Sequence, residues 1–140
     1  MTSNQNVLRW LDEMKALVKP MNVVWIDGSR EQMEDLKKQA LATGELEELN
    51  QELLPGCTLH RTAVNDVARV EHRTFICSRK KEDAGPTNNW EDPKVMYEKL
   101  SKLFNGVMHN RTMYIIPYSM GPIGSPYSKV GIELTDSIYV

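Results

Sequence analysis

The stretch TMYIIPYSMGPIGSPYSKVGIELT, residues 112–135, decides how this chain can fold. Residues 112–120 and 129–135 are rich in β-branched and aromatic side chains, which are typical of strands. The segment between them carries two glycines and two prolines, the residues that most often turn a chain for conformational reasons. We therefore predict two strands joined by a turn.

The glycines of this turn also raise the possibility of a phosphate-binding loop. Such a loop needs the spacing Gly-x-x-x-x-Gly-Lys-Ser/Thr, because backbone N–H groups wrap the phosphate while the lysine neutralises its charge. Here Gly121 and Gly124 are only three residues apart, and Ser128 precedes Lys129. The motif is absent, and the connection between strands is the better interpretation.

Upstream of this stretch the pattern alternates between helices and short strands. Apolar residues recur every three or four positions in 6–18, which predicts a helix that Pro20 stops; its inward positions are Val7, Trp10, Leu11, Met14, Leu17 and Val18. Residues 23–26 are apolar at every position, so we expect a strand covered on both faces.

Two further helices are predicted before residue 57. Ser29 followed by Gln32 matches a capping box, and Gly44 would end that helix. Its inward positions would be Met33, Leu36, Ala40 and Leu41. In 45–54, leucines at positions 46, 49 and 53 follow a helical spacing that ends at Pro55 and Gly56.

The middle of the chain is predicted from shorter signals. Residues 57–62 and 73–78 read as strands, with one helical turn capped by Asn65 and Asp66 between them. Residues 79–90 are polar and predict an exposed loop. Asp92 and Pro93 begin a helix that Gly106 ends, with Met96, Leu100, Leu103 and Phe104 expected to face the core.

These elements predict an α/β fold, with α+β as the alternative, in which helices flank a mixed β-sheet. A chain of 140 residues suits one domain, here residues 1–140. The last residues, 136–140, resemble a strand interrupted in mid-run, so we expect the domain to be truncated at this end.

Composition narrows the classes of function. With 41% hydrophobic and 26% charged residues and a net charge of −2, the chain is neither disordered nor basic enough to favour nucleic acid. It contains no apolar run of membrane length and no signal peptide, so we expect a cytoplasmic protein without membrane contact. Cys57 and Cys77 lack metal-binding spacing and are expected to be free thiols.

No complete catalytic constellation is visible. The three histidines show no metal-ligand spacing. The densest charged group comprises Asp66, Arg69, Glu71 and Arg73. A surface ion pair between Asp66 and Arg69 is one interpretation; an arginine presented to a small carboxylate or phosphate is the other, and spacing does not decide between them.

Two segments resemble the GTP-dependent phosphoenolpyruvate carboxykinases. RTMYIIPYSMGPIGSPYSKVGIELTDSIYV, residues 111–140, is similar to that family's signature stretch, and NDVARVEHRT, residues 65–74, is similar to its Asp-Val-Ala-Arg-Ile-Glu segment. A weaker resemblance reaches back through VVWIDGS to the first predicted helix. The resemblance implies the N-terminal domain of the carboxykinase fold.

The family converts oxaloacetate and GTP into phosphoenolpyruvate, GDP and CO2 in gluconeogenesis, using manganese and magnesium. The resemblance implies that Arg69 binds the substrate carboxylate and that Glu71 contacts the mobile lid. It also implies that the nucleotide-binding domain, the metal ligands and the lid lie outside this chain. We therefore expect no cofactor on the chain, and no activity from it alone.

A second hypothesis keeps the ancestry but changes the function. The chain would then be a free-standing binding or regulatory module that recognises a small dicarboxylate or a partner protein. A third interpretation is a structural domain without a ligand. The chain's own residues do not choose among the three.

Overall fold

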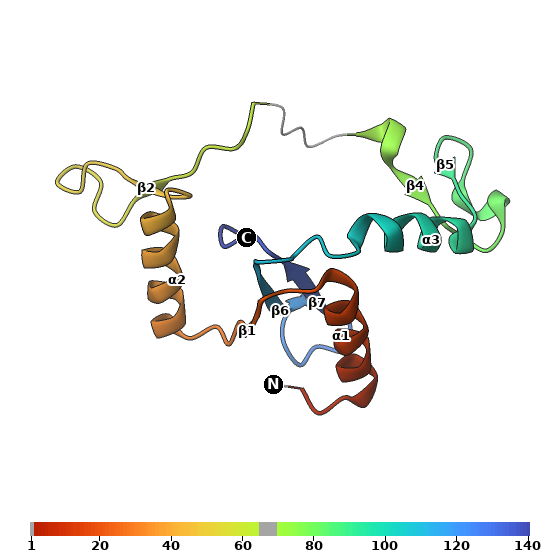
Figure 1. The fold of residues 1–140 in the computed structure, drawn as a ribbon, viewed down its shortest axis with the longest axis horizontal. Coiled ribbons are helices and arrows are strands. Elements are labelled where there is room, and N and C mark those ends of the chain that lie inside the picture. The colour runs from red at the N-terminus through yellow and green to blue at the C-terminus, as the bar shows by residue number, and fades with distance from the viewer. Residues whose placement is uncertain (1, 65–69) are drawn as a thin grey trace.

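The computed structural model describes residues 2–64 and 70–140 (Figure 1). Its centre is a three-stranded sheet in the order β1 (Asn22–Trp25), β6 (Thr112–Met120), β7 (Lys129–Thr135). β1 runs parallel to β6, whereas β6 and β7 are antiparallel. The mixed sheet and the two strands joined by a turn are confirmed.

The hydrophobic core lies between this sheet and α1 (Gln5–Val18). Leu11, Met113 and Ile115 are its most completely buried side chains. Asn4 caps the start of α1, because its Oδ1 accepts a hydrogen bond of 3.0 Å from the Asn6 N–H. The helix is confirmed, although Trp10, expected to face inward, remains 37% exposed.

β1 is not buried on both faces, contrary to the prediction from the sequence. It lies at the edge of the sheet, and Val23 is 39% exposed. The all-apolar run therefore does not mark a strand buried on both faces, because little of the chain covers its N-terminal half. Within this run, Trp25 packs against the core.

α2 (Arg30–Thr43) begins and ends where its caps predict. The Ser29 Oγ accepts a hydrogen bond of 3.2 Å from the Gln32 N–H, and Gly44 adopts φ +79° at the C-terminal end. The Gln32 side chain does not return to the Ser29 N–H as in a full capping box. Its Oε1 instead accepts from the Asp27 N–H and its Nε2 donates to the Trp25 carbonyl, which ties α2 to the end of β1.

The inward face of α2 is only partly confirmed. Ala40 is buried, but Met33 is 66% exposed. The helix lies away from the central sheet on one side of the molecule (Figure 1), so its apolar face has little to pack against.

The helix expected in 45–54 is wrong. β2 (Glu47–Glu48) pairs antiparallel with β3 (Thr58–Leu59), and turns join them. The Asn50 Oδ1 accepts from the Glu52 and Leu53 N–H groups, and the Gln51 Nε2 donates to the Leu49 and Cys57 carbonyls. These side chains satisfy the backbone locally and so compete with a helix.

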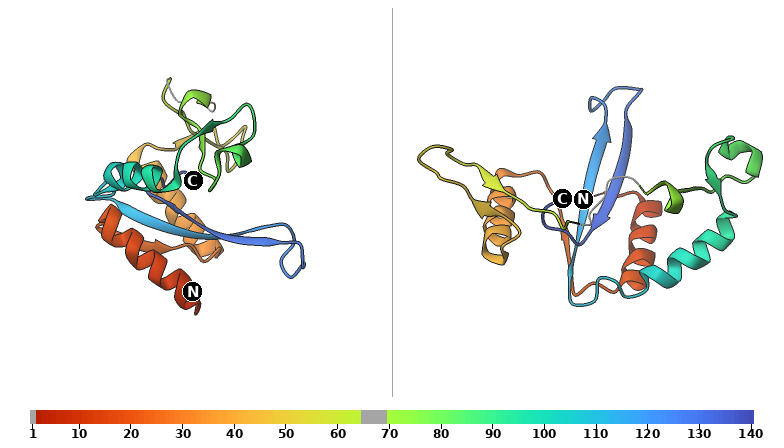
Figure 2. Two further views of the ribbon diagram at one scale, coloured as in Figure 1. Left: turned by 90° about the vertical axis from the view of Figure 1, so that its right-hand side faces the viewer. Right: turned by 90° about the horizontal axis from the view of Figure 1, so that it is seen from above.

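A second arm extends on the other side of the sheet (Figures 1 and 2). It contains the 3-10 turns η1 (Glu71–Arg73) and η2 (Lys81–Ala84), the parallel pair β4 (Phe75–Ile76) and β5 (Asn89–Trp90), and α3 (Pro93–Phe104). Of the strands predicted at 57–62 and 73–78, only residues 58–59 and 75–76 form strands. The segment expected to be a loop, residues 79–90, contains η2 and the whole of β5.

α3 begins as predicted, because the Asp92 Oδ1 accepts a hydrogen bond of 2.8 Å from the Lys94 N–H. Its predicted core face is wrong. Leu100, Leu103 and Phe104 are 41%, 71% and 47% exposed, and no residue of the helix is buried. The apolar spacing is genuine, but the described chain does not cover this face.

The C-terminal residues also differ from expectation. Residues 136–140 form no strand. They return along the molecule, and the Arg111 Nη1 contacts the Asp136 Oδ2 at 2.5 Å. Cys57 and Cys77 are exposed free thiols, as predicted. Within the described residues, no helix combines the length and apolar character needed to cross a membrane.

Candidate substrate-binding site

The predicted site residues lie close together in sequence, but only some fall within the described structure. Arg69 and Asp66 lie outside the described residues, as does the helical turn predicted around them. Glu71 opens η1, and Arg73 closes it. Of the predicted charged group, the structure therefore describes Glu71 and Arg73.

The backbone of Glu71 is held by its neighbours in η1 and by a distant side chain. Its carbonyl accepts a hydrogen bond of 3.1 Å from the Thr74 N–H and one of 2.7 Å from the Asn89 Nδ2. The Asn89 Nδ2 also donates to the Thr74 carbonyl at 3.1 Å. One amide side chain of β5 thus fixes both ends of the turn.

The strand pair behind this turn is fixed in the same way. The Trp90 Nε1 donates a hydrogen bond of 3.0 Å to the Ser78 carbonyl, and Phe75 lies opposite Asn89 in the register of β4 and β5. Each strand has only two residues, and these side-chain bonds connect β5 to the residues on either side of β4. The turn that carries Glu71 is thereby attached to a defined framework.

The side chain of Glu71 is exposed, in contrast to its anchored backbone. It takes part in none of the salt bridges formed among the described residues. A carboxylate in this position accepts hydrogen bonds from any donor that approaches the turn. The arrangement suits a contact made with another segment rather than proton transfer within the turn.

A second group of polar residues escaped the sequence analysis. The His60 Nδ1 lies 2.6 Å from the Glu45 carbonyl oxygen, and the His60 ring stacks on Tyr139. Burial, and then the negative charge of Glu45, raise the pKa of Tyr114. The Oε2 atom of Glu45 is buried without a hydrogen-bond partner among the described atoms.

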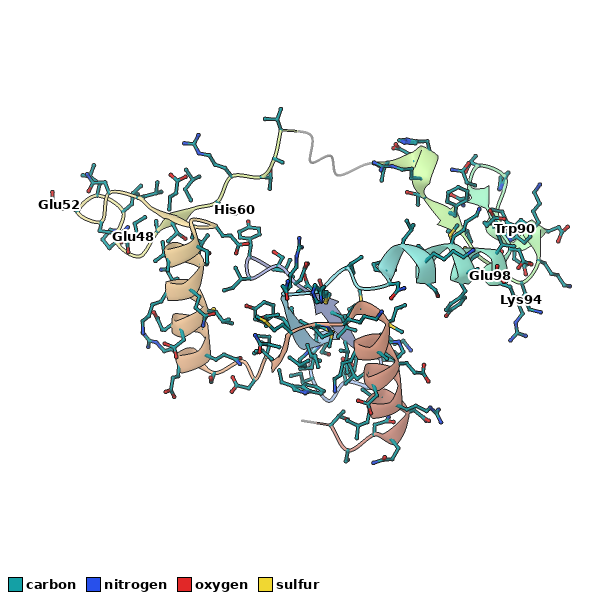
Figure 3. The ribbon with its side chains drawn as sticks, in the orientation of Figure 1. Glu48, Glu52, His60, Trp90, Lys94 and Glu98 are labelled. Carbon is teal, nitrogen blue, oxygen red and sulfur yellow. The ribbon has the colours of Figure 1, made fainter. Side chains whose placement is uncertain are left out.

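These four residues come from four separate segments of the chain, so no spacing in the sequence could reveal them. Two of them, Tyr114 and Tyr139, line a largely apolar groove between α2, β6 and the C-terminal residues, which also includes Leu36, Ile116 and Ile138. Figure 3 places His60 on the inner side of the arm that carries Glu48 and Glu52. The group joins the C-terminal residues to this arm.

A hollow also forms at the C-terminal end of β1, lined by residues that include Asn4, Trp10, Trp25, Asp27 and Pro117. The Asp27 Oδ1 accepts a hydrogen bond of 2.7 Å from the Ser29 N–H. This bond, with a smaller contribution from the Ser29 side chain, lowers the pKa of Asp27. The carboxylate therefore serves the turn into α2 and is a poor general base.

The described residues offer no ligand set for a divalent cation. No three side chains of His, Cys, Asp or Glu come together among them in a way that would hold a metal ion. Mn²⁺ and Mg²⁺ need several oxygen ligands at once. The described part of the chain does not fit either ion.

Comparison with known proteins shows what the chain is similar to. The family model described as the phosphoenolpyruvate carboxykinase N-terminal domain matches residues 9–140. Over 139 residues, the chain is 54% identical to the phosphoenolpyruvate carboxykinase [GTP] of Anaeromyxobacter sp. (strain K), and 48% identical to that of Corynebacterium efficiens. The corresponding protein of Chlamydia muridarum is 52% identical over 131 residues.

The matches cover almost all of this chain but only a small part of each relative. The match with the Anaeromyxobacter protein takes in 99% of this chain but 23% of the relative, and the Chlamydia match takes in 94% and 22%. The chain thus spans less than a quarter of the length of these relatives.

Proposed function

The chain belongs to the phosphoenolpyruvate carboxykinase N-terminal domain family, and from this we propose that it supplies substrate-binding residues for the GTP-dependent interconversion of oxaloacetate and phosphoenolpyruvate. The identity to named GTP-dependent carboxykinases over 99% of the chain is the observation that carries the proposal. The remaining parts of the reaction would be supplied by the regions that those relatives have outside the matched segment.

In this proposal Arg69 binds the carboxylate of the substrate. A guanidinium presents two parallel N–H donors to a carboxylate, and this geometry fixes the orientation of the bound molecule as well as its position. Lysine carries the same charge but lacks the planar fork. The orientation matters because decarboxylation of oxaloacetate leaves an enolate that must then meet a phosphoryl group.

Glu71 has a different role in the proposal. Its exposed carboxylate accepts hydrogen bonds from a lid segment and so stabilises the closed state over the substrate. Closure excludes the water that would protonate the enolate to pyruvate. The anchored backbone of η1 supports this role, because a lid contact is effective only when its acceptor is held in place.

The other components are also proposals. Manganese or magnesium, with GTP, would bind to regions of a carboxykinase outside the matched segment, where the cation neutralises charge during phosphoryl transfer. The 140-residue chain alone is then inactive. We place the protein in the cytoplasm, since its exposed free thiols suit a reducing compartment.

A chimaera tests the proposal directly. This chain would replace the matched segment of the Anaeromyxobacter enzyme, and oxaloacetate-dependent phosphoenolpyruvate formation would be measured with GTP. Replacing Arg69 by Ala should lower kcat/KM roughly a hundredfold, because two charge-assisted hydrogen bonds to the substrate are lost.

The control is Arg79→Ala, which removes an exposed arginine of the same arm and should change kcat/KM less than about twofold. Arg69→Lys should recover little of the loss. Equal effects of the two alanine variants, or full activity of Arg69→Ala, would contradict the proposal.

A further inference from the structure

The chain exposes more surface than a protein of its mass normally does. Its accessible surface is 11431 Å², and its mass is 16.0 kDa. A folded monomer of this mass exposes about 7,400 Å². The excess, about 4,000 Å², is in the range of obligate interfaces between polypeptides.

The outer edge of β7 is one part of this excess. The Ile115 carbonyl accepts a hydrogen bond from the Ile26 N–H, so the backbone groups of Ile115 face β1 and not β7. Groups alternate along antiparallel strands, and Ile115 lies opposite Leu134. The backbone groups of Leu134, Ile132 and Val130 therefore point outward, where no described residue bonds to them.

Apolar side chains are exposed where the hairpin turns between β6 and β7. Met120, Ile123, Tyr127 and Val130 are 66%, 94%, 88% and 81% exposed. We call these four residues the hairpin patch. Both views of Figure 2 show the hairpin of β6 and β7 projecting away from the rest of the chain. An edge strand with free donors and acceptors beside apolar side chains is a template for another strand.

We propose that β7 receives a further strand, and the hairpin patch its cover, from the region that carboxykinase relatives carry outside the matched segment. The inference rests on membership of the family and not on the proposed substrate role. The occupant follows from length, because the matched segment is 23% of the Anaeromyxobacter polypeptide and more than three quarters remains.

A second copy of this chain is the weaker occupant. Pairing of two β7 edges would cover one strand and part of the hairpin patch on each copy. The exposed apolar face of α3 lies in the other arm, away from the hairpin, and would stay uncovered (Figures 1 and 2). A large polypeptide region could cover both the β7 edge and the apolar face of α3.

Hydrogen exchange measures the state of this edge. Amide exchange of peptides covering residues 129–135 would be followed in the 140-residue chain and in the chimaera with the Anaeromyxobacter enzyme. We expect the amides of Val130, Ile132 and Leu134 to exchange freely in the chain alone and to be protected in the chimaera.

Val130→Pro in the chimaera removes one outward donor while keeping the bonds between β6 and β7. Protection of the neighbouring amides should fall about tenfold, the equivalent of one lost hydrogen bond. Val130→Thr keeps the donor and is the matched control. Circular dichroism of both variants in the 140-residue chain separates this effect from misfolding, since neither should alter its spectrum.

Three outcomes would overturn the inference. The first is free exchange of 129–135 in the chimaera, the second is equal protection in Val130→Pro, and the third is protection in the chain alone that rises with its concentration, which would identify a second copy. The substrate role fails separately, through loss of turnover in a chimaera whose β7 amides are protected.

Discussion

The ring of His60 stacks on the ring of Tyr139, with centroids 3.8 Å apart and planes inclined by 17°. More than half of the chain lies between the two residues in sequence. The Nδ1 of the same imidazole lies 2.6 Å from the Glu45 carbonyl oxygen, so one ring joins two loops. The stack is therefore a fixed contact between the C-terminal residues and the arm that carries α2.

The first prediction concerns this contact. Tyr139→Ala should lower the free energy of unfolding by about 0.5–1.5 kcal/mol beyond the lost apolar area, the usual range for an aromatic pair. Tyr139→Phe keeps the ring and should cost little. Urea unfolding of the two variants, together with His60→Ala and the double variant, gives the coupling between the rings. Additive effects of the single variants would show that the stack contributes nothing.

The second prediction concerns Glu71 in the chimaera. Glu71→Gln keeps the shape of the side chain but removes its charge, so a weakened lid contact should lower kcat roughly tenfold. Pyruvate should rise relative to phosphoenolpyruvate, because water reaches the enolate. Glu82→Gln, in η2 of the same arm, is the control and should change neither quantity. Unchanged product ratios in Glu71→Gln would exclude the lid role.

The third prediction concerns a close approach in the hairpin. A Cβ atom at Gly131 would lie 2.5 Å from the Cζ of Tyr118, which faces it across the strands. Gly131→Ala should destabilise the chain by about 1–3 kcal/mol through overpacking. Tyr118→Ala in the same chain should relieve most of this cost. If the double variant loses as much unfolding free energy as the two single variants added together, the crowding lies elsewhere.

The fourth prediction concerns acid stability. The hydrogen bond from the Ser29 N–H lowers the folded-state pKa of Asp27 below its model-compound value of 3.8. The charged carboxylate therefore stabilises the fold above pH 3.8, and this contribution is lost as the pH falls through the lower, folded-state pKa. Asp27→Asn should be less stable than the parent chain at pH 7.

The difference between Asp27→Asn and the parent should shrink below pH 3.8, once the parent carboxyl is protonated. Urea midpoints measured at pH 7 and at about pH 3 compare the two proteins. Asp12→Asn, which removes the carboxylate from an exposed pair with Lys15 on α1, is the control. A gap for Asp27→Asn that is the same at both pH values would contradict the assignment.

Local signals in the sequence were dependable where a few neighbouring residues settle the structure. The caps Ser29 and Asp92 start their helices because their side-chain oxygens accept from backbone groups two or three residues away. Gly44 ends its helix because a left-handed φ is needed there. The hairpin of β6 and β7 follows from two strand-forming runs on either side of a turn.

The same signals failed where the outcome depends on what lies opposite. The leucine spacing in 45–54 fits a helix as well as it fits the observed strand and turns. Asn50 and Gln51 bond to the turn backbone, and the segment pairs with β3. The apolar side of α3 has the right period, yet the described chain provides no surface against it. Periodicity reports which side chains share a face and says nothing about what covers it.

The candidate site was also predictable only in part from the sequence. The residues NDVARVEHRT identify the family and single out Arg69 and Glu71, which remain predictions for the chimaera to test. The anchoring of the Glu71 carbonyl by Asn89, 18 residues away, emerges only in the folded chain. So do the stack of His60 on Tyr139 and the free outer edge of β7.

By itself, then, the sequence determined the strands of the hairpin, the helix starts and the family, because these depend on bonds and conformational preferences within a few residues. Only the tertiary structure decided which faces are buried, which edge stays open and which distant side chains meet. Burial and long-range contacts depend on segments that chain entropy keeps apart until the whole fold forms.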